Sequence, residues 1–216
     1  SWMPTKYEDI QAMVKMVPTL SSRQPAVIPP SPELREELVA EMKAYGISET
    51  PPITADPPDN FPYRRLILPF FTPAAVDEYR PFTEALCNEL IDKFIDKGGC
   101  DAAEDYAQQV PPRVIAMMLG IDPNRADDFV EWTRGLLELG QTQPELRIKY
   151  RRVIREFFAE LVADRRKAPR DDLISRLVQA EIEGEPVTDH TAIGMCNLLL
   201  VAGIDTTWSS LGSSLW

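Results

Sequence analysis

The sequence predicts a mainly α-helical protein, and two observations carry that prediction. Apolar residues recur at helical spacing along most of the chain after residue 72, whereas strand-like alternation is scarce and no internal repeat is present. Hydrophobic residues make up 44% of the 216 residues and charged residues 26%, which suits a globular protein with a real core. We expect a single domain over residues 1–216, truncated at both ends, because its start is already amphipathic and its end falls within a helical pattern.

The first 72 residues predict short helices separated by proline-rich loops. One helix is expected over residues 7–17, where the apolar side chains share a face. A second is expected over residues 31–45, because it opens with a Ser–Pro pair and Gly46 follows its end. A third can start at Pro62, and Pro69 then cuts it short.

From Pro73 onward the helical signals are stronger. Thr72 and Thr188 are placed to cap two of the helices, and Gly98 and Gly99 stop the first of these. The pair Pro111–Pro112 predicts a kink or a restart inside its segment. The expected helices span residues 73–97, 101–119, 123–139, 143–167, 171–182 and 191–215.

Charge and composition exclude several functional classes. The net charge of −11 argues against a general nucleic-acid-binding protein, which needs a positively charged surface. The longest apolar run, residues 198–202, is too short to span a bilayer, so we expect no membrane partner. His190 is the one histidine, and the three cysteines are far apart, so no metal site is expected within the chain. Isolated cysteines favour a reducing compartment, and we expect a cytoplasmic protein.

The last expected helix contains an unusual combination of residues. The run LLLVAGIDTT at 198–207 is apolar and then places Gly203, Asp205 and Thr206 in mid-helix. A buried helical glycine costs about 1 kcal/mol relative to alanine, and a buried carboxylate costs more unless it is partnered. Both costs on one turn indicate that something approaches the backbone at Ala202–Gly203. The alternative is a helix crossing made possible by small residues, with Asp205 in a buried salt bridge.

The segment AGIDTT at 202–207 resembles the central long helix of the cytochromes P450, which are haem-thiolate monooxygenases. Three further segments resemble motifs of that family in the same order: ADPPDNFPYRRLILPFFTP at 55–73, YAQQVPPRVIAMMLGI at 106–121 and DDLISRLVQAE at 171–181. The resemblance covers nearly the whole chain and is closest to the soluble bacterial members. It implies an incomplete cytochrome P450 fold that spans the helix B to helix I region, with few strands.

The resemblance also implies a haem (iron protoporphyrin IX) site. Arg64 corresponds to the family arginine that pairs with a haem propionate, and a guanidinium fits a carboxylate bidentately. Asn60 stands where the family usually has a histidine, so it can donate to a carboxylate without carrying charge. Ala202, Gly203 and Thr206 are expected beside the haem, where the missing Cβ of Gly203 leaves room for oxygen.

Catalytic and substrate-binding roles follow from the same resemblance. Asp205 and Thr206 are the expected catalytic residues, because oxygen cleavage in a dry pocket needs an acid and a hydroxyl–water chain to deliver protons. Val201 and Leu198, one and two turns before Asp205, are expected to face a small hydrophobic substrate. Electrons from NAD(P)H are expected to arrive through a ferredoxin or a flavodoxin.

The sequence departs from the family pattern in one essential respect. The loop that carries the axial cysteine is absent, and we expect that cysteine downstream of residue 216. Cys87, Cys100 and Cys196 are interpreted as structural, so the 216 residues alone are expected to be inactive. The competing hypothesis is a non-catalytic helical module that binds a ligand or another helix.

Overall fold

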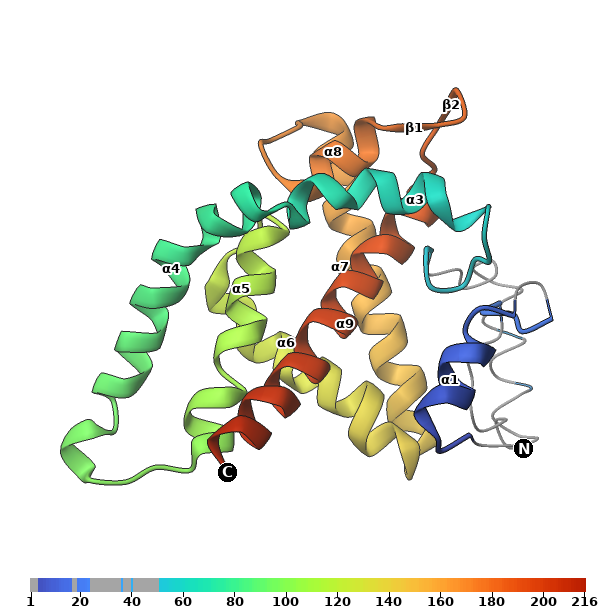
Figure 1. Cartoon of the computed structure of the whole chain (residues 1–216). Helices are drawn as coiled ribbons and strands as arrows, with labels where there is room; N and C mark the ends of the chain where they lie inside the picture. The colour runs from blue at the N-terminus through green and yellow to red at the C-terminus, as the bar shows by residue number, and fades with distance from the viewer. Residues whose placement is uncertain (1–3, 17–18, 24–35, 37–39, 41–50) are drawn as a thin grey trace.

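The computed structural model describes residues 4–16, 19–23, 36, 40 and 51–216, and these residues are mostly helical (Figure 1). The mainly α prediction is therefore confirmed. The α-helices are α1 (Tyr7–Met13), α3 (Asn60–Ile67), α4 (Pro73–Asp92), α5 (Val110–Met118), α6 (Ala126–Thr133), α7 (Pro144–Lys167), α8 (Leu173–Gln179) and α9 (Asp189–Leu215). The helix expected over 31–45 lies outside the described residues, apart from residues 36 and 40, which are helical.

The proline signals act at helix starts more than in helix interiors. After α3, the chain tightens into a 3₁₀ turn, Leu68–Phe71, because Pro69 has no N–H for the α-helical ladder. The segment expected over 101–119 divides into a π-helical turn, Ala102–Ala107, and α5, in whose first turn the proline pair lies. Backbone N–H groups in the first turn of a helix have no acceptor within the helix, so nothing is lost when proline lacks one. The prolines therefore begin a helix instead of kinking one.

The expected helix over 171–182 ends early. The α8 helix stops at Gln179, and a two-stranded antiparallel hairpin follows, β1 (Glu181–Ile182) and β2 (Glu185–Pro186). Its turn holds Glu183 and Gly184 at φ values of 55° and 88°, a left-handed conformation that ends helical propagation. The predicted caps are confirmed, because the side chains of Thr72 and Thr188 each accept a hydrogen bond from the first turn of α4 and α9.

Helix α9 runs through the middle of the molecule and packs mainly against α5 and α7 (Figure 1). By length and composition it could cross a membrane, yet its buried side chains belong to the main hydrophobic core, as in the central helix of a globular domain. The same core holds an aromatic cluster from α6 and α7: Phe129, Trp132, Phe157 and Phe158. The core therefore fixes where α9 lies relative to its neighbours.

Two consecutive arginines at the end of α7 connect this helix to α8, to the start of α9 and to the turn at Gly120. Arg165 is 1% exposed and donates through Nε to Asp172 at 2.6 Å and through Nη2 to the carbonyl of Gly120 at 3.1 Å. Arg166 donates to the carbonyls of Val178 and Val187 and pairs with Asp189, the first residue of α9. Charge-assisted hydrogen bonds of this kind hold the start of α9 against α7 and α8.

Candidate functional site

Helix α9 has one buried face and one open face. Its buried residues are Ala192, Gly194, Met195, Cys196, Leu200, Ile204 and Trp208. On the open face, Ala202 and Thr206 are exposed and Asp205 is half-buried. The Thr206 hydroxyl donates to the carbonyl of Ala202, four residues earlier in the helix, at 2.7 Å. The polar residues of the AGIDTT run therefore lie at the edge of the core.

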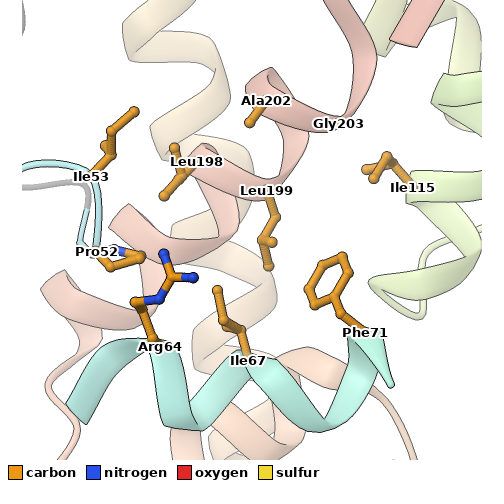
Figure 2. Close-up of a pocket in the computed structure, with 10 residues that line it drawn as sticks. All are labelled: Pro52, Ile53, Arg64, Ile67, Phe71, Ile115, Leu198, Leu199, Ala202 and Gly203. Carbon is orange, nitrogen blue, oxygen red and sulfur yellow. The ribbon is translucent and has the colours of Figure 1, made fainter. Parts of the chain in front are cut away.

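A cavity of about 420 Å³ lies between α3 and α9 (Figure 2). Helix α9 forms one wall, α3 and the turn after it form the opposite wall, and the loop before α3 closes one side. The lining is Pro52, Ile53, Arg64, Ile67, Phe71, Ile115, Leu198, Leu199, Ala202 and Gly203. Apolar side chains dominate this lining, and a cavity of this kind suits a mostly apolar ligand.

Arg64 is the one charged residue of the cavity lining. Helical spacing places Arg64, Ile67 and Phe71 on one face of α3 and its 3₁₀ extension, and Figure 2 shows all three directed toward α9. Within the part of the chain that the structure describes, Arg64 forms no ion pair. Its guanidinium is therefore available to an anionic group of a ligand.

One helical turn before Arg64, Asn60 begins α3. Its Oδ1 atom is buried and has no hydrogen-bond partner among the described residues. A buried polar atom without a partner is costly, and such atoms are rare in folded proteins. The Asn60 amide thus retains capacity for a further polar contact.

Gly203 has a packing role that the sequence left open. A Cβ built at this position would overlap the side chain of Ile115, which comes from α5. The missing side chain therefore lets α5 and α9 approach, as in the helix-crossing interpretation. Gly203 and Ile115 also both line the cavity, and the expected role of Gly203 beside oxygen stays a prediction.

The structure brings four of the predicted site residues together: Arg64, Leu198, Ala202 and Gly203 line the cavity. The other four, Asn60, Val201, Asp205 and Thr206, lie on α3 or α9 but outside that lining, and their roles stay predictions.

Six lining residues were not predicted from the sequence. Ile67 and Phe71 could have been found from their spacing to Arg64, and Leu199 from its position four residues before Gly203. Pro52, Ile53 and Ile115 reach the cavity only through the folding of the chain.

The three cysteines lie in different surroundings. Cys100 is exposed, Cys87 is half-buried and Cys196 is fully buried. Burial, assisted by the charge of Asp172, raises the pKa of the Cys196 thiol to about 12, so its thiolate is strongly disfavoured. Among the described residues, no three His, Cys, Asp or Glu side chains lie close enough to form a metal site.

The chain is similar to bacterial cytochromes P450 in sequence. It is 30% identical over 217 residues to cytochrome P450 107B1 of Saccharopolyspora erythraea, an alignment that covers 99% of this chain and 52% of that protein. It is 29% identical over 213 residues to the polyketide biosynthesis cytochrome P450 PksS of Bacillus subtilis, with 99% and 52% covered. No family model matches the chain.

Solved structures agree with the sequence comparison. The structure of PksS from Bacillus subtilis superposes with a TM-score of 0.75 at 27% identity, over 96% of this chain and 50% of that one. The P450 MycG F286A mutant in complex with mycinamicin IV gives a TM-score of 0.68 at 28% identity, over 76% and 42%. Sequence and fold identify the chain as a cytochrome P450 segment. It spans about half the length of the curated relatives that it matches.

Proposed function

We propose that the chain is part of a haem-thiolate monooxygenase that inserts one oxygen atom from O2 into a small hydrophobic substrate. Electrons would come from NAD(P)H through a ferredoxin or flavodoxin, and the protein would work in the cytoplasm. Relatives named as cytochromes P450, a hydroxylase/epoxidase and a monooxygenase support the reaction class. The observation that carries the proposal is Arg64, a cation without an ion-pair partner among the described residues, which faces α9 across an apolar cavity.

The residues of the cavity fit a haem. Its porphyrin is flat and apolar, and its two propionates are carboxylates at one edge. The apolar lining from α3 and α9 suits the ring, and the Arg64 guanidinium suits one propionate as a bidentate partner. One turn earlier on α3, the Asn60 side chain could donate to a propionate through Nδ2 only, because its Oδ1, which has no partner among the described residues, is an acceptor.

The residues of α9 would manage protons and exclude water. When bound, haem supplies the oxygen chemistry, and the protein supplies orientation and proton delivery. Because the Thr206 proton is already donated to the carbonyl of Ala202, the hydroxyl oxygen can accept a hydrogen bond and hold a water molecule. Asp205, half-buried and adjacent, can exchange protons with solvent and pass them to that water. Leu198 would contact the substrate from the cavity wall.

Haemin titration of purified chain tests the proposal, with Arg64→Gln as the variant and Arg65→Gln as the matched control on the same helix. Losing a charged hydrogen-bonding partner should raise the Kd for haemin about 10-fold or more. Arg65 does not line this cavity, although it shares a neighbouring hollow with Arg64, Ile67 and Phe71, so its replacement should change the Kd by less than about 3-fold. Equal effects of the two substitutions, or none, would contradict the assignment of Arg64.

The monooxygenase activity needs a second experiment. In a protein that joins this chain to the cysteine loop expected after residue 216, the reduced carbon monoxide adduct should show the thiolate-type Soret band. Thr206→Ala should then increase oxygen consumption relative to product formation, because water is no longer held beside α9. Unchanged coupling of oxygen to product would remove Thr206 from the mechanism.

A further inference from the structure

The carboxylate of Asp56 joins two segments that are more than thirty residues apart in sequence. Ser21 Oγ donates to Asp56 Oδ2 at 2.6 Å, and the backbone N–H of Ser22 donates to Asp56 Oδ1 at 2.7 Å. The Arg23 Nε atom lies 3.6 Å from Oδ2 of the same carboxylate. Both oxygens of Asp56 thus receive hydrogen bonds from residues 21 and 22, and a cation lies beside them.

Asp59 forms a second contact to the same segment but in a different setting. Its carboxylate lies 3.2 Å from Arg23 Nη2, and both side chains are about two-thirds exposed, at 64% and 66%. The Asp56 side chain is only 15% exposed. Surface ion pairs contribute little, so Asp56 is the group that holds residues 21–23 in place. The hydrogen bonds from Ser21 and then Ser22 also lower the pKa of Asp56, which keeps it ionised.

The loop that carries Asp56 forms one side of the cavity. Pro52 and Ile53 line the same cavity as Arg64 (Figure 2). Within this loop, the N–H of Ala55 donates to the carbonyl of Pro52 at 3.2 Å. The carbonyl of Asp56 accepts from the N–H of Asn60 at 3.1 Å, where α3 begins. Asp56 is therefore connected to the cavity wall, to the start of α3 and to residues 21–23.

We propose that Asp56 is a positioning residue for the ligand of this cavity. Its bonds to residues 21 and 22 fix the Pro52–Ile53 wall against the face of α3 that carries Arg64. Without these bonds the wall loses its connection to residues 21 and 22, and a ligand that contacts it must order it further upon binding. Such ordering lowers affinity, because entropy that was lost during folding is now lost during binding. The use of haemin as the ligand rests on the proposed function, whereas the fixing of the wall does not.

The test compares Asp56→Ala with Asp59→Ala in the full 216-residue chain. The control removes a carboxylate of the same charge that also contacts Arg23 but bonds neither serine. Amide hydrogen exchange is measured in residues 19–23, 53–55, α7 and α9, and the Kd for haemin is measured in the same buffer. Should Asp56→Ala not fold, Ser21→Ala removes one donor to the same carboxylate and leaves its charge in place.

Asp56→Ala should accelerate exchange at Ser22 and at residues 53–55 about 10-fold, with α7 and α9 unchanged. It should raise the Kd for haemin about 3- to 10-fold, whereas Asp59→Ala should change either quantity by less than about 2-fold. Equal effects of both variants would overturn the proposal, as would acceleration that extends equally to α7 and α9. If the unmodified chain fails to bind haemin, the proposed function fails, and exchange at residues 53–55 alone decides the role of Asp56.

Discussion

The close packing of Ile115 against Gly203 predicts how Gly203→Ala changes the free energy of unfolding. Whether the substitution stabilises or destabilises the chain depends on the role of the glycine. By helix propensity alone, Gly203→Ala should stabilise α9 by about 1 kcal/mol. The new Cβ would, however, overlap the Ile115 side chain, and overpacking of a core costs about 1–3 kcal/mol. The net expectation is a loss of about 0–2 kcal/mol in the free energy of unfolding.

Gly212 is the matched control, because it lies in the same helix and a Cβ there meets nothing within 4 Å. Gly212→Ala should stabilise the chain by up to about 1 kcal/mol, and less if the last turns of α9 fray. In the Ile115→Ala background, which itself costs about 2–5 kcal/mol, Gly203→Ala should become stabilising because it fills the space that Ile115 leaves. The two substitutions should therefore show strong coupling.

Urea unfolding followed by far-ultraviolet circular dichroism measures all four variants. If Gly203→Ala stabilises the chain as much as Gly212→Ala in the unmodified background, the helix crossing does not depend on the glycine. Loss of coupling between residues 115 and 203 would lead to the same conclusion. In either case the remaining reason for a glycine at 203 would be the ligand, as the resemblance to the cytochromes P450 implies.

Three other predictions concern ionisable groups. Because its pKa is about 12, Cys196 should be a thiolate in only about one molecule in 10⁴ at pH 8, so a thiol reagent should label the exposed Cys100 and leave Cys196 unlabelled until the chain unfolds. Asp172→Ala should cost about 2–4 kcal/mol by urea unfolding, because the buried Arg165 loses one of its two carboxylates, although it keeps Asp164, and α8 loses its side-chain cap; a cost below about 1 kcal/mol would contradict that reasoning. Asp56 has a lowered pKa, so its stabilising effect should be complete above its ordinary value of 3.8 and should be lost as the pH falls through its lower folded value. A stability difference between the unmodified chain and Asp56→Asn that does not shrink as the pH falls below 3.8 would disagree.

The sequence predicted those features of the helices that depend only on neighbouring residues. The caps Thr72 and Thr188 act within their own first turns, so neighbouring residues were sufficient to place them. The hairpin at residues 181–186 was missed because its strands are only two residues long and carry almost no alternation. The prolines at 111 and 112 predicted a kink or a restart, and the structure shows the restart, because the preceding turn ends before them and they lie in the first turn of α5.

The candidate site shows the same division. The sequence by itself determined that residues 198–207 form an apolar helix with a glycine and a polar pair, and that Arg64 belongs to a helix after a proline-rich loop. Only the tertiary structure decided that Arg64 faces Leu198 and Ala202 across one cavity, and that Ile115 fills the space above Gly203. The physical reason is that helical periodicity fixes which residues share a face, whereas the partner of each face is set by packing between distant segments. The bonds between Ser21, Ser22 and Asp56 likewise depend on the folded chain, because no periodic pattern connects these positions.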